Sequence, residues 1–77
     1  MSKTEMMTEL GNNIRKIRKA RHITQEELAH RVGKDQQSIQ RLEAGRMNPS
    51  AYYLLEIAHG LGVDTCQLLS GIFIKDQ

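Results

Sequence analysis

Apolar residues recur along this chain at intervals of three and four, the spacing that puts side chains on one face of an α-helix. No segment alternates polar and apolar residues for long enough to predict a sheet strand. With 77 residues the chain has room for one small domain, which we expect to be all-α. The inward faces are predicted at Met7, Leu10, Ile14 and Ile17, then Leu28, Ala29 and Val32, then Ile39 and Leu42, and finally Ala51, Leu54, Ile57, Ala58 and Leu61.

Residues that cap helices divide this apolar pattern into five segments. Thr24, Asp35, Ser50 and Asp64 each precede a segment, and their side-chain oxygens can accept hydrogen bonds from the free amides of a first helical turn. Glu27 follows Thr24 by three residues, which is the spacing of a reciprocal capping box. Glycines close the segments, as suits the left-handed ends of helices. We therefore expect helices from residue 4 or 8 to residue 20, at 25–32, at 36–44 and at 51–61, and a short fifth helix at 65–70.

The net charge of +2 conceals an uneven distribution of charge along the chain. Residues 12–46 hold nine Lys or Arg against four Asp or Glu, a net +5, and the remainder has a net −3. A basic segment on a nearly neutral chain indicates a surface for a polyanion. A charged face that is simply solvated explains the same pattern equally well, so charge alone does not decide the function.

Two of the predicted helices, 25–32 and 36–44, are separated only by Gly33, Lys34 and Asp35. A glycine-containing turn of this length between two helices is typical of a helix-turn-helix. With Ile39 and Leu42 facing inward, the second helix turns amide, hydroxyl and guanidinium groups outward. Such groups hydrogen-bond base edges in the major groove, whereas a helix that only faces water would more often carry Glu and Lys. The outward residues are Gln36, Gln37, Ser38, Gln40 and Arg41.

From residue 10 to residue 71 the chain resembles the phage-repressor and Cro-type (XRE-like) helix-turn-helix family. The resemblance is carried by residues 24–29 (TQEELA), residues 39–45 (IQRLEAG), Pro49-Ser50 and Leu61-Gly62-Val63. It implies a five-helix, lambda-repressor-like DNA-binding domain that regulates transcription, with the helix at about 36–44 lying in the major groove of double-stranded DNA. It also implies a cytoplasmic protein of a bacterium or phage.

The resemblance also assigns roles to individual residues on and around the recognition helix. Gln36, Gln37, Gln40 and Arg41 would read bases, although Arg41 stands where a related phage repressor carries a third glutamine. Gln25, Ser38, Arg46 and Asn48 would contact backbone phosphates, Ser38 with a base as the alternative. Arg18 and Glu43 match a partly buried ion pair of the family, and both follow predicted inward-facing residues. We therefore expect this pair to be structural.

A recognition helix reads too few base pairs to select one site in a genome, and a dimer that presents two such helices solves this problem. Tyr52 and Leu55 lie off the inward stripe of their helix, and Ile72, Phe73 and Ile74 follow the last predicted helix. We expect self-association through these residues, with closure of the core by the last three as the alternative. The chain thus divides into an N-terminal extension (1–9) that joins the first helix, the helix-turn-helix domain (10–71) and a tail (72–77).

Other kinds of function find less support in the sequence. His22, His30 and His59 do not have the spacing of metal ligands, and Cys66 has no second cysteine to pair with. We expect no metal, no cofactor, no small-molecule substrate and no enzymatic activity. No apolar run approaches the ~20 residues of a membrane span.

The alternative to a regulator that acts on DNA alone is an antitoxin or a restriction-modification controller. In that role a protein partner, or self-association through Tyr52, Leu55 and the tail, is as important as DNA. A membrane-surface peptide built on the basic first helix is disfavoured, because that helix shares a core with its capped successors.

Overall fold

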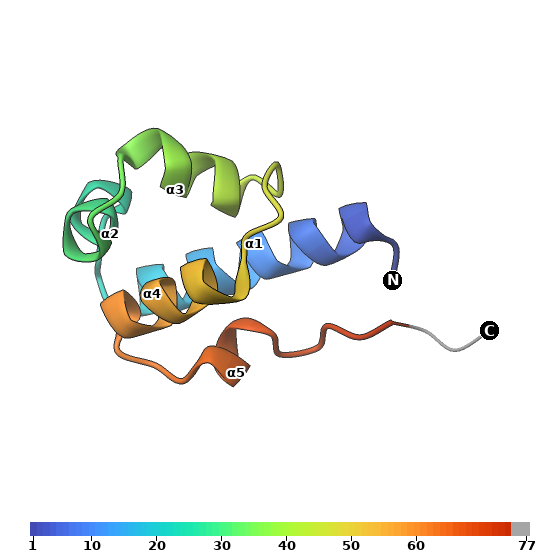
Figure 1. Ribbon diagram of the computed structural model, residues 1–77. Helices are drawn as coiled ribbons and strands as arrows, with labels where there is room; N and C mark the ends of the chain where they lie inside the picture. Colours follow the sequence, from blue (N-terminus) through green and yellow to red (C-terminus); the bar gives the residue numbers. More distant parts are fainter. Residues whose placement is uncertain (75–77) are drawn as a thin grey trace.

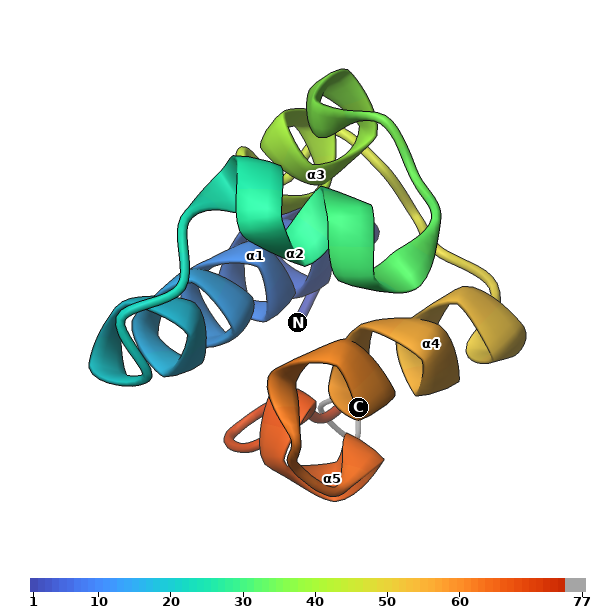
Figure 2. The same ribbon diagram turned by 90° about the vertical axis from the view of Figure 1, so that its left-hand side faces the viewer.

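A computed structural model describes residues 1–74, and within them the chain forms five α-helices and no strand. The helices are α1 (Lys3–Ala20), α2 (Gln25–Val32), α3 (Gln36–Glu43), α4 (Ala51–Leu61) and α5 (Thr65–Leu68). Figures 1 and 2 show α2 and α3 at one end of the molecule and α5 at the other, with α1 and α4 between them. The all-α, five-helix fold class predicted from the sequence is confirmed.

The N-termini of α2, α3 and α4 are capped by the residues that the sequence indicated. Thr24 Oγ1 accepts from the amide of Glu27 at 3.0 Å, and Asp35 Oδ1 accepts from the amide of Ser38 at 2.7 Å. Ser50 Oγ accepts from the amide of Tyr53 at 3.1 Å. Each bond satisfies an amide that has no partner within its own helix, so these short helices have defined starting points.

The starts of α1 and α2 differ in detail from the prediction. The first helix begins at Lys3, earlier than expected, because Ser2 and Glu5 form a complete capping box: Ser2 Oγ and Glu5 Oε1 each accept a backbone N–H at 3.1 Å. Residues 3–9 are therefore part of α1. The box predicted at Thr24 is only half formed, since the Glu27 carboxylate lies 3.7 Å from Arg31 Nη2, one turn further along the helix.

The core gathers apolar side chains from all five helices. It consists of Leu10, Ile14, Ile23, Leu28, Ala29, Ile39, Leu42, Ile57, Ala58, Leu61 and Leu68. Ala51 was predicted to face inward and is exposed, because it is the first residue of α4 and precedes the turns that reach the core. Leu69 was expected inside the last helix, but α5 ends at Leu68 and Leu69 is exposed.

Close backbone contact joins α1 to the end of α3. A Cβ atom on Gly11 would lie 2.5 Å from the carbonyl oxygen of Glu43 and 2.7 Å from that of Leu42. Glycine lacks that atom, so the two helices approach more closely than any other residue would permit. This contact fixes the distance between α1 and the C-terminal end of α3.

After α5 the described residues run along α1 toward the N-terminus. Asn13 Nδ2 donates to the carbonyl oxygens of Leu68 and Ser70, at 2.9 Å each, and the terminal amino group donates to the carbonyl oxygen of Phe73 at 3.3 Å. Ile72 packs against the core, while Phe73 and Ile74 are exposed. Within the described residues, the helices are too short or too polar to cross a membrane.

Candidate nucleic-acid interface

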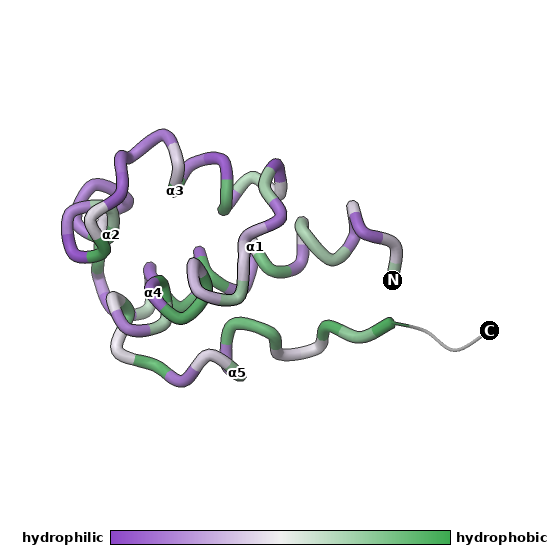
Figure 3. The backbone as a smooth tube through the Cα atoms, in the orientation of Figure 1, coloured by the Kyte–Doolittle hydropathy of each residue, from purple (hydrophilic) through white to green (hydrophobic). Residues whose placement is uncertain are grey.

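The outer face of α3 is polar and exposed. Ile39, Leu42 and Glu43 are buried, and Figure 3 shows the rest of α3 in hydrophilic colours. The side chains of the four predicted base readers point to solvent, and within residues 1–74 none of them makes a hydrogen bond. These four are Gln36, Gln37, Gln40 and Arg41.

The turn between α2 and α3 is fixed at both ends. Gly33 adopts a left-handed conformation with φ +68°, which lets the Lys34 amide donate back to the carbonyl oxygen of Ala29 at 2.9 Å. Asp35 then caps α3. Because both ends of the turn are held, α3 projects from the molecule at a defined angle to α2.

Arg18 and Glu43 are brought together between α1 and the last turn of α3. Arg18 Nε and Nη2 donate to the two carboxylate oxygens of Glu43 at 2.7 and 2.9 Å, and Arg18 Nη1 donates to the carbonyl oxygen of Ile23 at 2.9 Å. Hydrogen bonding to Glu43 raises the pKa of Arg18, and both side chains are buried. This two-pronged ion pair ties α3 to α1.

Two of the predicted phosphate-contact residues already have partners inside the chain. Gln25 Nε2 donates to Glu43 Oε1 at 3.1 Å, which leaves the oxygen and the second amide proton of that side chain uncommitted. Ser38 Oγ shares a hydrogen bond of 2.7 Å with the hydroxyl of Tyr53. Arg46 and Asn48 lie exposed in the loop between α3 and α4.

Tyr53 and its surroundings were not identified from the sequence. Lys34 Nζ lies 4.8 Å from the centre of the Tyr53 ring and 3.0 Å from Glu56 Oε1, and hydrogen bonding to Glu56 raises the pKa of Lys34. These contacts connect the helix-turn-helix to α4. Tyr53 could have been identified from its position three residues after the Ser50 cap, because that spacing places its side chain in the first turn of α4.

A groove of about 630 Å³ runs beside the first residue of α3. Its walls come from the end of α1, the turn after α1, the start of α2 and the first residue of α3. They include Lys19, His22, Ile23, Gln25, Glu26 and Gln36. The groove therefore extends the surface of α3 with charged side chains of both signs, polar groups and apolar surface.

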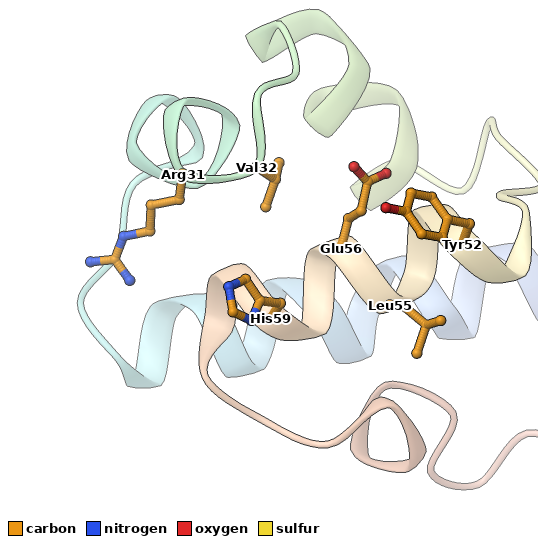
Figure 4. A pocket seen from close by; sticks show the side chains of 6 residues that line it. All are labelled: Arg31, Val32, Tyr52, Leu55, Glu56 and His59. Carbon is orange, nitrogen blue, oxygen red and sulfur yellow. The ribbon is translucent and has the colours of Figure 1, made fainter.

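A second hollow, of about 340 Å³, lies between α2 and α4. Figure 4 shows Tyr52, Leu55, Glu56 and His59 along α4, with Arg31 and Val32 above them on α2. Tyr52 and Leu55 are 71% and 53% exposed. Its lining mixes apolar side chains with charged ones, and none of the lining residues comes from α3.

The tight turn, the buried support of α3 and its polar outer face define a helix-turn-helix DNA-binding domain. The sequence profile of the helix-turn-helix family HTH_3 matches residues 14–68. The chain belongs to this XRE/Cro-C1-type family of DNA-binding transcriptional regulators.

Relatives and solved structures agree with this assignment. An uncharacterized HTH-type transcriptional regulator, y4dJ, of Sinorhizobium fredii is 38% identical over 66 residues, 86% of each chain. Another, from Methanothermobacter thermautotrophicus, is 45% identical over 64 residues, 83% of this chain and 88% of the relative.

Among solved structures, the restriction-modification controller protein C.AhdI from Aeromonas hydrophila is similar, with a TM-score of 0.79 and 29% identity. The match covers 80% of this chain and 94% of that one. The clp gene regulator ClgR from C. glutamicum has a TM-score of 0.81 and 28% identity, over 83% of this chain and 82% of its own.

Proposed function

We propose that α3 is the recognition helix of this regulator and that its N-terminal half enters the major groove of double-stranded DNA. Gln36, Gln37, Gln40 and Arg41 read base edges there. The observation that carries the proposal is that these four side chains are exposed together and make no hydrogen bond within residues 1–74. A glutamine amide can bond N6 and N7 of adenine, and an arginine can bond O6 and N7 of guanine.

Phosphate contacts on both sides of α3 hold the helix in register. Gln25 acts through the amide proton that its bond to Glu43 leaves free, Ser38 acts through the hydroxyl that it shares with Tyr53, and Arg46 and Asn48 act from the loop after α3. If each half-site neutralises about four phosphates, the logarithm of the binding constant falls by ~0.9 per neutralised phosphate against the logarithm of the salt concentration.

The regulator works as a homodimer, because one recognition helix cannot select a single genomic site. Two half-sites about 34 Å apart then match two recognition helices. Tyr52, Leu55, Phe73 and Ile74 offer exposed apolar surface for the contact. The side chain of Ile72 is partly buried against the core, so it contributes to the dimer contact by holding the neighbouring Phe73 and Ile74 in place.

Selection of bound duplexes from a random pool, followed by gel mobility shift at about 150 mM salt, tests this function. Gln36→Ala should relax the preference at its own base pair at a cost of about 1–3 kcal/mol, while Arg46→Ala should weaken binding to all duplexes alike. Equal binding of the wild type to selected and random duplexes would overturn the proposal. Equal effects of both variants on every sequence would contradict the division of roles.

The similarity to C.AhdI keeps a role as restriction-modification controller as the alternative, and an antitoxin role is tested by co-purification of a stoichiometric protein partner. The chain is about as similar to ClgR, a clp gene regulator, as it is to C.AhdI, so the comparisons do not favour the role of restriction-modification controller over that of another transcriptional regulator. Regulators of this family are typically not enzymes, and we infer the same for this chain. Its place of action is the compartment that holds the DNA, which in a bacterium is the cytoplasm.

A further inference from the structure

A pair of hydroxyl groups lies beside the first turn of the recognition helix. Ser38 Oγ and Tyr53 Oη are 2.7 Å apart, the usual length of an O–H···O hydrogen bond. Ser38 comes from the first turn of α3 and Tyr53 from the first turn of α4, and both residues are half-buried. The pair therefore sits at the junction of two elements, within reach of solvent.

One of the two hydroxyl protons of this pair is not used in a hydrogen bond within the described chain. Each hydroxyl carries one proton and two acceptor lone pairs. Their mutual bond uses one of the two protons, whichever residue supplies it. Within residues 1–74 neither hydroxyl has another hydrogen-bonding partner, so the second O–H can bond a group from outside the chain.

The surroundings of Tyr53 hold its side chain in place. Lys34 Nζ lies over the ring, 4.8 Å from its centre, and is itself held by Glu56 at 3.0 Å. A cation over the ring face is attracted to its π electrons, so Lys34 helps to fix the ring that carries the hydroxyl. The hydroxyl pair is thus a fixed, neutral donor, whereas the nearby Lys34 is already partnered.

We propose that Ser38 and Tyr53 act as one unit and donate a hydrogen bond to a backbone phosphate of the bound DNA. The proposal rests on the proposed function, because the phosphate is supplied by DNA whose major groove holds α3. Arg46 and Asn48 lie in the loop that leads directly into the first turn of α4. The hydroxyl pair therefore continues the proposed phosphate contacts from that loop toward the first turn of α3.

A neutral donor has a signature that differs from that of a cation. Arg46 releases counterions when it binds a phosphate and so steepens the dependence of binding on salt. The hydroxyl pair adds affinity without a charge, so its loss should lower affinity by the same factor at every salt concentration. A hydrogen bond to a charged group accounts for a change of about tenfold.

The test compares the double variant Ser38→Ala/Tyr53→Phe with Ser70→Ala on the duplex that the wild type selects from a random pool. The double variant removes both hydroxyls, because either one alone would keep a proton free for the phosphate. Ser70 follows α5, is exposed, and its hydroxyl has no partner within residues 1–74. Each protein is also bound to duplexes in which one phosphate at a time is replaced by an uncharged methylphosphonate.

We expect Ser38→Ala/Tyr53→Phe to bind about tenfold more weakly at all salt concentrations, and Ser70→Ala to bind like the wild type. The wild type should respond to a methylphosphonate at one phosphate to which the double variant has become insensitive. Binding of the double variant equal to that of Ser70→Ala would overturn the proposal. Weaker binding with wild-type sensitivity at every phosphate would also overturn it, since the role would then be purely structural.

Failure of the proposed function is visible separately, in the wild type alone. Equal binding of the wild type to selected and random duplexes would overturn both proposals. A wild type that prefers the selected duplex, combined with an unaffected Ser38→Ala/Tyr53→Phe, would overturn only the hydroxyl pair.

Discussion

Replacing Glu43 by alanine tests how far the position of the recognition helix depends on a buried charge. Three hydrogen bonds converge on its carboxylate, two from Arg18 at 2.7 and 2.9 Å and one from Gln25 at 3.1 Å. The side chains of Arg18 and Glu43 are only 9% and 2% exposed. In Glu43→Ala the guanidinium stays buried and keeps only its bond to the carbonyl oxygen of Ile23.

The expected loss is large for a chain of this size. Removing one partner of a buried ion pair costs about 3–5 kcal/mol, because the other charge remains without compensation. A domain of this length has a free energy of unfolding of about 4–12 kcal/mol. With an m-value of about 1 kcal/mol/M in urea, the unfolding midpoint should fall by about 3 M or more.

Urea unfolding followed by far-UV circular dichroism measures this change. The control Glu27→Ala removes an exposed carboxylate 3.7 Å from Arg31 and should cost less than about 0.5 kcal/mol. The double variant Arg18→Met with Glu43→Leu should recover most of the loss, because no charge is left buried. The reasoning is refuted if Glu43→Ala lies within about 1 kcal/mol of the wild type, or if the double variant is no more stable than the single one.

Three further predictions follow from local geometry. Gly11→Ala puts a Cβ atom 2.5 Å from a carbonyl oxygen at the end of α3, so it should lower the free energy of unfolding in urea by about 1–3 kcal/mol; unchanged stability would contradict the close packing. Lys19 lines the groove beside the recognition helix, so Lys19→Ala should make the salt dependence of DNA binding shallower by about 0.9 in slope. Lys16→Ala, from an exposed position of α1 outside that groove, should leave the slope unchanged, and equal effects of the two variants would argue against a phosphate in the groove. The pKa of Glu5 lies below its ordinary value of 4.5, because the backbone N–H of Ser2 donates to its carboxylate. The stability that this contact contributes is therefore present above pH 4.5 and is lost as the pH falls through the lower, folded-state pKa. The Cα chemical shifts of the first turn of α1 should move toward coil values as the pH falls through that pKa. Glu5→Gln keeps a hydrogen-bond acceptor but has no carboxyl group to protonate, so its shifts should not move.

Helix ends were predictable from the sequence where the deciding interaction is local. Thr24, Asp35 and Ser50 bond amides three residues ahead, so residue type and spacing suffice to place the starts of α2, α3 and α4. The start of α1 carried the same kind of signal in Ser2 and Glu5. The apolar spacing begins only at Met7 and does not extend to this cap, so it predicts a start at residue 4 or 8, and the observed start at Lys3 lies one residue before the earlier of these.

Interactions between distant parts of the chain were predictable only where the family resemblance supplied them. Arg18 and Glu43 were expected as a pair on that ground, together with their places after inward-facing residues. The bond between Ser38 and Tyr53 had no such precedent. It depends on how α4 lies against α3, and sequence spacing does not encode that angle.

The recognition helix is supported from three other helices by contacts of different kinds. α1 holds it through Arg18 and the close approach at Gly11, α2 through Gln25, and α4 through Tyr53. The outer face of α3 takes no part in this support, so its side chains can change without loss of the fold. Substitutions on that face should therefore alter which duplexes are bound at nearly constant stability. Substitutions among the supporting residues should lower affinity for all duplexes, because they move the whole helix.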